Sequence, residues 1–540
     1  MAATFNTQPS ETRDAQLGGL NRRVVRRIDW AIFLTVLVAS LYVLPRWADP
    51  NQNSRLDMVV AVVDDHTFRI DNYVHNTVDY ARVGDAYYSD KAPGAALLGI
   101  PLYAAVDPVL DAVLDEDVTG ALANAPAFQA TLRADGTGVS TEKLRFAALQ
   151  VLLAALVAAL PTALAAVLVW RLALRFTGAP GASALSALAY GLLTPVFAYS
   201  NAVYGHQLAA FLLIGAFALL ALGPPRAGAL RLLLLGVLLG YAVVSEYPAA
   251  VPAGFIFLYA AWRLWQAHAP LRLGWTMLAG GAVAAGWMSY NSAIFGGPLA
   301  LGYSHSELWT EQHSTGFMSL SLPTLDGIWG ITFSAYRGLF LLSPWLLLAL
   351  PGFVIWWRWG RARAEWWVTL ACALSMFAFN ASSHMWWGGF AVGPRYVLPA
   401  LPFLALAAAA TLAQWAPSRA FRWSTAVLML WSLLATWGMA LANQAYPPDT
   451  LRNPWLSYAL PAWQDGNIAR NLGTIGGLPG SASLLPLLLI AALGSVLVVS
   501  TLRAQRVVVH SSLPAAAPAA PAAPSSALPT GLKTTNPEIH

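Results

Sequence analysis

The chain has 540 residues, of which 57% are hydrophobic and 11% charged, and its mean hydropathy is +0.55. Soluble domains carry about 25% charged residues, so this composition indicates an integral membrane protein of helices rather than of alternating strands. A single cysteine, Cys372, excludes an intrachain disulfide and a thiolate metal site. The formal net charge of +5 comes from scattered basic residues, which is not a nucleic-acid signal.

Long apolar segments of helical length follow a polar N-terminal stretch. We predict an all-α polytopic membrane protein with about 12 transmembrane helices, because each span needs about 20 apolar residues. Residues 1–27 are expected to be a disordered cytoplasmic N-terminus, and 503–540 a disordered Ala/Pro-rich cytoplasmic tail. The transmembrane domain covers 28–502 and includes a long first extracytoplasmic loop, 46–145. The predicted spans are 28–45, 146–170, 182–200, 203–223, 230–245, 247–264, 273–290, 339–357, 366–382, 396–415, 425–441 and 483–501.

One apolar run within the first loop decides the sidedness of everything that follows it. Residues 92–106 contain Pro93, Gly94, Gly99 and Pro101 and are too short to span, so we interpret them as an interfacial helix. With a cytoplasmic N-terminus, the inner segments then hold 19 of the 31 Lys and Arg but 5 of the 26 Asp and Glu. This bias follows the positive-inside rule. The sequence predicts a multi-pass protein of the inner (plasma) membrane with an extracytoplasmic active site.

The first loop is the most polar stretch of the chain, and we expect the chemistry there. Lys91 follows Asp90 at the membrane edge, where it could bind a lipid phosphate as a point charge or form a simple ion pair with Asp90. Asp57 is the first candidate for a general base and Asp79 the second, with Asp49 a distant third.

Ionisable residues at the predicted outer ends of the spans form a second group, since charges at the membrane edge are costly unless they are paired or functional. Arg337 and Arg395 run against the charge bias, so we expect them at a donor phosphate, with snorkelling as the alternative. His305 and His313 are too weakly spaced to predict a metal site, and a requirement for a divalent cation stays open. The other expected pocket residues are Arg55, Asp90, His206, Glu246, His305 and His384.

These features together resemble the GT-C superfamily of membrane glycosyltransferases, which includes protein O-mannosyltransferases (glycosyltransferase family 39 type) and lipid A aminoarabinose transferases. The resemblance covers roughly residues 28–501. It rests on the acidic loop after the first span, on Lys91-Ala92-Pro93 before a membrane-surface helix, and on the stretch Gly393-Pro394-Arg395-Tyr396-Val397-Leu398-Pro399.

The resemblance implies that a first-loop acid deprotonates the acceptor and that Lys91 holds the donor phosphate, with Arg337 or Arg395. It also implies a polyprenyl-phosphate sugar as donor. The sequence departs from the family at one point: Asn51-Gln52-Asn53 stands where relatives carry an Asp-Glu pair, which shifts the expected base to Asp57.

We therefore expect an inverting glycosyltransferase that moves a sugar from a polyprenyl-phosphate donor to a glycan, lipid or protein acceptor, without an organic cofactor and without nucleic acid. Two alternatives stay open. One is a non-enzymatic lipid or solute transporter, although such proteins show interrupted helices at matching positions in two halves. The other is a catalytically inactive scaffold with the GT-C fold.

Overall fold

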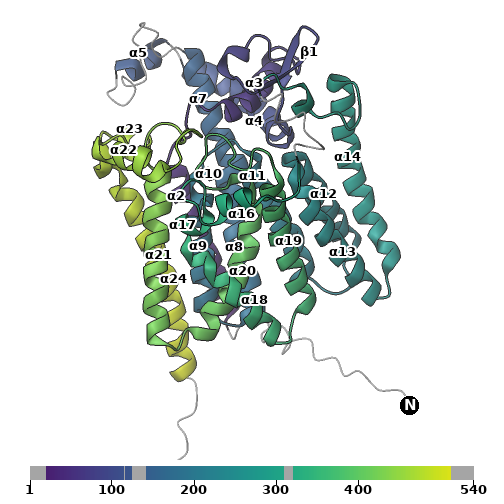
Figure 1. Cartoon of the computed structure of the whole chain (residues 1–540), viewed down its shortest axis with the longest axis vertical. Helices are drawn as coiled ribbons and strands as arrows, with labels where there is room; N and C mark the ends of the chain where they lie inside the picture. The colour runs from purple at the N-terminus through teal and green to yellow at the C-terminus, as the bar shows by residue number, and fades with distance from the viewer. Residues whose placement is uncertain (1–19, 115, 125–140, 309–319, 512–540) are drawn as a thin grey trace, which may run out of the picture.

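The structure is a computed structural model that describes residues 20–114, 116–124, 141–308 and 320–511. Long, roughly parallel helices form a bundle, and a smaller unit, here called the cap, covers one end of it (Figure 1). The first and last helices of the described chain, α2 (Arg22–Tyr42) and α24 (Leu485–Ser511), pack against one another along the bundle. Helix α2 begins, and α24 ends, at the end away from the cap.

Helices occupy all twelve ranges that the sequence marks as spans. Five described helices are long and apolar enough to cross a membrane by length and composition, so the count of twelve spans stays a prediction. Besides α2 and α24, the bundle contains α8 (Leu160–Thr177), α9 (Pro180–Leu192), α10 (Val196–Tyr199), α11 (Gly205–Ala221), α12 (Ala229–Ser245), α13 (Ala250–Gln266), α14 (Leu273–Phe295), α16 (Leu325–Thr332), α17 (Leu339–Leu342), α18 (Ala349–Arg358), α19 (Arg363–Ser382), α20 (Leu401–Trp415) and α21 (Arg419–Ala440), with α22 (Leu460–Gln464) and α23 (Leu472–Ile475) at its capped end.

Two of the predicted spans are broken rather than continuous. The range 182–200 divides into α9 and α10 next to Pro195, and the range 339–357 divides into α17, a 3₁₀ turn beginning at Pro344, and α18. Proline lacks a backbone N–H and disfavours helical geometry in the residue before it, so each proline starts a new helical segment instead of continuing the old one.

The cap is built mainly from the first loop, and it is more regular than the sequence suggested. Helix α3 (Pro50–Asp64) begins with Asp49 as its N-cap and Pro50 as its first residue, which is a favoured way to start a helix. The strands β1 (Tyr80–Val83) and β2 (Ala86–Ser89) form an antiparallel hairpin, and its turn includes Gly84 at a φ of 62°. The cap also contains a 3₁₀ turn (Val74–Asn76), α5 (Glu116–Asn124) and the start of α7 (Thr141–Ala154), which continues through a π-helical turn (Ala155–Ala159) into α8.

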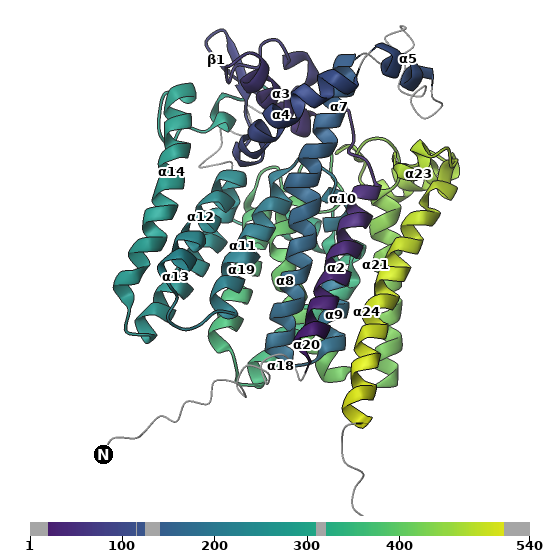
Figure 2. The same cartoon turned by 180° about the vertical axis from the view of Figure 1, so that it is seen from behind.

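The apolar run 92–106 lies within α4 (Gly94–Val113), and the expectation that it is too short to span was wrong, because this helix has 20 residues and is one of the five that are long and apolar enough to cross a membrane. Helix α4 packs against α3 in the cap and not among the helices of the bundle (Figure 2). Buried residues of both helices, such as Leu56, Val59 and Ala96, share a small core with α7.

A close contact joins the cap to the bundle where α4 begins. A Cβ atom at Gly94 would lie 2.6 Å from Oγ and 2.7 Å from Cα of Ser245, the last residue of α12. Tyr241 of α12 donates its hydroxyl to the carbonyl of Gly94 at 2.7 Å. Glycine therefore allows an approach that any other residue at this position would block.

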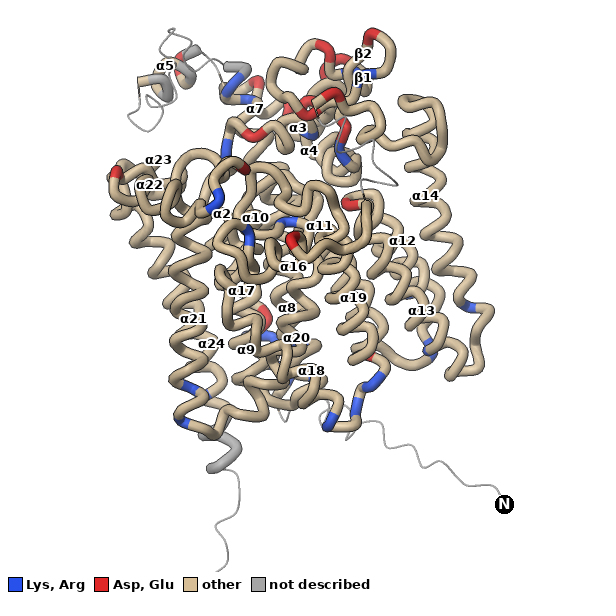
Figure 3. The backbone as a smooth tube through the Cα atoms, in the orientation of Figure 1, with Lys and Arg blue, Asp and Glu red and all other residues tan. Residues whose placement is uncertain are grey.

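Charge is distributed unevenly between the two ends of the molecule. Acidic residues gather in the cap, while the far end of the bundle carries mainly Lys and Arg (Figure 3). This distribution matches the pattern from which the sequence predicts an extracytoplasmic cap, and that sidedness stays a prediction.

Candidate functional site

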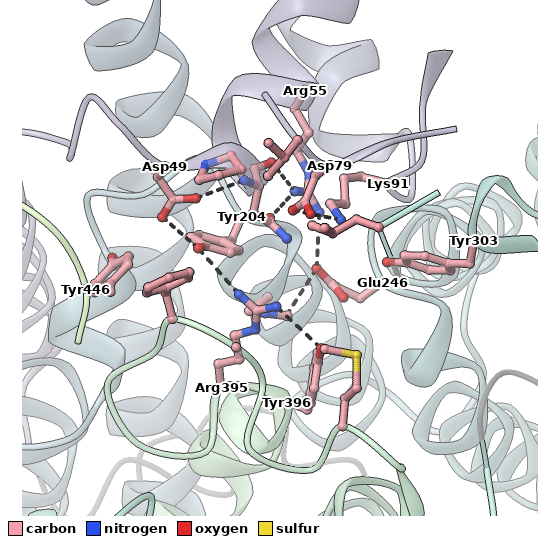
Figure 4. Close-up of a pocket in the computed structure, with 18 of the residues that line it drawn as sticks. Asp49, Arg55, Asp79, Lys91, Tyr204, Glu246, Tyr303, Arg395, Tyr396 and Tyr446 are labelled. Carbon is pink, nitrogen blue, oxygen red and sulfur yellow. Dashed lines mark hydrogen bonds and ion pairs between the residues drawn. The ribbon is translucent and has the colours of Figure 1, made fainter. Parts of the chain in front are cut away.

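A pocket of about 570 Å³ lies where the cap meets the bundle (Figure 4). This volume falls within the range of small-molecule binding sites, about 300–1,000 Å³. Seven charged side chains line it, together with tyrosines and apolar residues that include Leu299, Leu301 and Phe379. The charged residues are Arg46, Asp49, Arg55, Asp79, Lys91, Glu246 and Arg395.

On one wall, Asp49 is bonded to both the cap and the bundle. Its Oδ1 accepts the backbone N–H groups of Asn51 (3.0 Å) and Gln52 (3.2 Å), as expected of an N-cap. Its Oδ2 accepts the hydroxyl of Tyr204 at 2.8 Å, and the Tyr204 oxygen in turn accepts an N–H of Arg395 at 3.5 Å. Burial raises the pKa of Asp49 above its usual range, although the Tyr204 hydrogen bond and the Arg395 charge act in the opposite direction.

On another wall, Lys91 is enclosed by two carboxylates. Its Nζ lies 3.0 Å from Oδ2 of Asp79 and 3.0 Å from Oδ1 of Asp90. Burial acts to lower the pKa of Lys91, but the two neighbouring carboxylates outweigh it and raise this pKa above the usual range. The expected ion pair with Asp90 is therefore made, Asp79 is a second partner, and the positive charge of Lys91 is already balanced within the cap.

Between these walls, Glu246 joins a cap arginine to a bundle histidine. Glu246 follows the last residue of α12, and its Oε1 lies 3.1 Å from Nδ1 of His206 and 3.8 Å from an Nη of Arg55. His206 stands in the first turn of α11 and stacks on the ring of Tyr204, with 5.6 Å between ring centroids. Because a carboxylate holds Nδ1, the orientation of the imidazole is fixed, which leaves Nε2 as the nitrogen without a hydrogen-bond partner.

Arg46 and Arg395 also line the pocket. Neither forms an ion pair with a carboxylate of the described residues. The Arg395 guanidinium lies 5.4 Å from the ring centre of Tyr204 and 5.2 Å from that of Tyr396. That of Arg46 lies 4.3 Å from the ring centre of Tyr446. Lys91 and Arg55 are paired with carboxylates, so the remaining positive charge of the pocket lies on Arg46 and Arg395.

The structure brings together several of the residues that the sequence marks as functional. Lys91 and Arg395, far apart in the chain, line the same pocket, as do Asp79, His206 and Glu246. Arg55 also lines it, and Asp90 contacts it through Lys91.

Asp57, the first candidate for the base, is placed elsewhere. It is fully buried in the cap, is not among the residues that line the pocket, and accepts a hydrogen bond from the side-chain amide of Asn76 at 3.1 Å. Burial raises the pKa of Asp57 to about 8, while the Asn76 hydrogen bond acts to lower it. A catalytic role for Asp57 stays a prediction that this placement does not favour.

Arg337, His305 and His384 also lie outside the lining of the pocket. Arg337 is fully buried and donates to three carbonyls, those of Tyr336 (3.3 Å), Trp387 (3.0 Å) and Gly389 (2.8 Å). Since Gly389 itself lines the pocket, Arg337 supports the pocket wall from behind. His305 stacks on Phe295, and His384 is exposed.

Sequence reasoning gave no role to Arg46 or to the tyrosines of the pocket. A signal for the placement of Asp49 was present, because an Asp followed by Pro is a common helix start. No comparable local signal marks Arg46 or Tyr204, which reach the pocket through tertiary packing. The tyrosines that line the pocket are Tyr204, Tyr303, Tyr396 and Tyr446.

No cluster of three or more His, Cys, Asp or Glu that could hold a metal ion is found within the described ranges. His313, paired with His305 in the sequence argument, lies outside the described residues.

Fold and site together define a polytopic helical membrane protein with a charged pocket beneath a cap. No protein-family model matches the chain, and no curated protein matches it either. Among solved structures it is similar to ArnT from Cupriavidus metallidurans bound to undecaprenyl phosphate, at 14% identity and a TM-score of 0.44, over 89% of this chain and 75% of that one. The apo state of the same protein gives 15% identity and a TM-score of 0.43, over 88% and 74%.

With TM-scores below 0.5, the likeness says nothing about activity, which has to be argued from the pocket.

Proposed function

We propose that the chain is a glycosyltransferase that takes a sugar from a polyprenyl-phosphate donor at the pocket beneath the cap. The observation that carries the proposal is the division of charge within this pocket. Arg395, which has no carboxylate partner among the described residues, lines the same cavity as the carboxylate of Asp79. A cation for a leaving phosphate and a carboxylate for an acceptor proton are the two groups that such a transfer needs.

In the proposed reaction, Asp79 removes the proton of an acceptor hydroxyl as the oxygen bonds to the anomeric carbon. The bond from this carbon to the donor phosphate breaks, and the electron pair leaves with polyprenyl phosphate. Arg395 stabilises the charge that gathers on the phosphate, with Arg46 as the second available cation. Lys91, 3.0 Å from Asp79, positions this carboxylate. We assign the base to Asp79 because it lines the pocket and Asp57 does not.

The apolar part of the lining suits a lipid-linked substrate. Leu299, Leu301 and Leu308 follow α14 and line the pocket, and Phe379 and Phe390 line it from α19 and from the loop after it. A polyprenyl tail can lie against such residues while its phosphate reaches the arginines. The sugar, the acceptor and the extracytoplasmic position of the cap belong to this proposal as expectations from the sequence.

Binding of undecaprenyl phosphate, the carrier that the proposed transfer releases, tests the proposal without knowledge of the sugar. We expect purified wild-type protein to bind it in a native mass-spectrometry titration, and Arg395→Gln to bind about 10-fold or more weakly, since hydrogen bonds to charged groups contribute about 1.5–3 kcal/mol. Arg82→Gln is the matched control, because Arg82 is an exposed cap arginine paired with Glu307 and lies outside the pocket lining. Equal affinity in wild type and Arg395→Gln would exclude the proposed phosphate site.

A further inference from the structure

A second hollow lies within the bundle, away from the cap pocket. It has a volume of about 540 Å³ and is formed by residues of α9, α21 and α24. We call it the α9–α21–α24 groove. Both views place α21 and α24 at the same edge of the bundle (Figures 1 and 2). The large side chains Leu185, Leu488 and Val499 in its walls are 40%, 47% and 46% exposed, so the groove opens to the surroundings of the bundle.

The walls of this groove are suited to a hydrocarbon chain. Nearly all of its lining residues are Leu, Val, Ala or Gly, and small residues such as Ala184, Ala491 and Ala492 leave the space open. The polar groups of its walls have hydrogen-bond partners within the protein. The indole N–H of Trp437 donates to the carbonyl of Leu192 at 2.8 Å, and the hydroxyl of Ser495 donates to the carbonyl of Ala491 at 2.8 Å. No hydrogen-bonding partner is needed from an occupant along these walls.

One end of the groove is different, because Arg503 lines it. The Arg503 side chain is exposed and makes no ion pair with a carboxylate of the described residues. It lies toward the end of α24 that is far from the cap, where basic residues gather (Figure 3). Basic pockets between transmembrane helices are known sites for anionic lipid headgroups.

The groove is also longer than one leaflet of a membrane is thick. From Leu488 to Arg503 the wall formed by α24 is roughly 22 Å long, at about 1.5 Å per residue. Half of a hydrocarbon core is about 15 Å thick. The groove is therefore long enough to cover the full depth of one leaflet for an acyl chain whose headgroup lies at Arg503.

We propose that the α9–α21–α24 groove binds one anionic phospholipid, with its phosphate headgroup at Arg503 and an acyl chain against α9 and α24. The apolar walls provide the binding area, and the uncompensated arginine provides the preference for negative charge. The proposal does not depend on the reaction at the cap pocket, since the two sites share no residue.

The test uses full-length protein, stripped of lipid in detergent and titrated with phosphatidylglycerol or phosphatidylcholine of matched chains, with bound lipid counted by native mass spectrometry. We expect wild type to retain phosphatidylglycerol at least 5-fold more tightly than phosphatidylcholine. Arg503→Gln is expected to abolish this preference, and Ala492→Trp, which fills the groove, is expected to weaken binding of both lipids. Arg358→Gln is the control, because this exposed arginine ends α18 outside the groove.

Three outcomes would overturn the proposal. The first is equal binding of the two lipids by wild type, and the second is an unchanged preference in Arg503→Gln. The third is displacement of phosphatidylglycerol from the groove by undecaprenyl phosphate in competition, reversed by Ala492→Trp, which would assign the groove to the donor lipid. Both substitutions lie at exposed positions, so a melting temperature near that of wild type is expected and is checked first.

Discussion

Tyr204 donates its phenolic hydroxyl to Oδ2 of Asp49 at 2.8 Å, and this hydrogen bond crosses from the bundle to the cap inside the wall of the pocket. Asp49 caps α3, and Tyr204 immediately precedes α11. The same phenolic oxygen accepts an N–H of Arg395. Tyr204 therefore connects a buried carboxylate to the arginine that we assign to the donor phosphate.

Tyr204→Phe is expected to lower the free energy of unfolding by about 1–3 kcal/mol, because a hydrogen bond to a charged group is lost while the ring stays in place. The pKa of Asp49 should rise further, since the Tyr204 hydrogen bond holds it down. Thermal unfolding in detergent measures the first effect. Tyr458→Phe is the control, because its hydroxyl bonds only to the carbonyl of Ala445, at 2.7 Å and near the surface. Equal melting of both variants would show that the Asp49 contact adds no more stability than a hydrogen bond near the surface.

Asp79→Asn and Asp57→Asn separate the two candidates for the base. A general base contributes typically about 10²–10⁴-fold to a rate. We expect Asp79→Asn to lose about that much in kcat of sugar transfer to the acceptor while still binding undecaprenyl phosphate. Asp57→Asn should keep its kcat within a few-fold of wild type, because Asp57 does not line the pocket. The reverse result, with transfer lost only in Asp57→Asn, would return the base to Asp57.

The pKa of about 8 at Asp57 predicts a pH-dependent stability. Between the unfolded value of 3.8 and about 8, the folded protein keeps a proton that the unfolded chain has lost. Stability from this group is thus fully present below about pH 4 and falls as pH rises, with a slope of up to roughly 1.4 kcal/mol per unit. Asp57→Asn should melt at a higher temperature than wild type at pH 8. Its melting temperature should also depend less on pH between pH 5 and 8. Parallel melting curves for the two proteins across this range would contradict the shift.

Glu246→Gln is expected to destabilise the protein, because Arg55 and His206 both lose their carboxylate partner in a buried site. Removing one member of a buried ion pair typically costs about 3–5 kcal/mol. Replacing both Arg55 and Glu246 by Met should recover most of the stability without recovering transfer, since both residues line the pocket. If Glu246→Gln melts like wild type, the contacts of Glu246 with Arg55 and His206 do not contribute to the stability of the protein.

Much of the bundle follows from the sequence, since apolar runs separated by Arg-rich turns mark where helices begin and end. The direction in which individual side chains point does not follow from the sequence. Arg337 and Arg395 look alike in sequence, as outward arginines next to glycine or proline. In the structure, Arg337 donates hydrogen bonds to three backbone carbonyls, whereas Arg395 lines the pocket. That distinction depends on which carbonyls the fold brings within reach.

The cap was harder to predict than the bundle. Helix α3 has polar residues such as Gln52, Ser54 and Asp57 buried on several faces, so it lacks the apolar stripe by which a helix is usually recognised. Position along the chain also does not decide between Asp57 and Asp79 as the base. Both lie in the first loop, but only the strand that begins directly after Asp79 turns that residue toward Lys91.

The contact between Gly94 and Ser245 has a consequence for how substrates reach the pocket. At this seam the start of α4 lies directly against the end of α12, and the hydroxyl of Tyr241 is bonded across it, so the cap is fixed to the bundle at this point. For the lipid carrier of the proposed function, we therefore expect entry between helices from the bilayer, without movement of the cap at this seam. Crosslinking the seam, for example through cysteines placed beside it, should accordingly leave turnover unaffected.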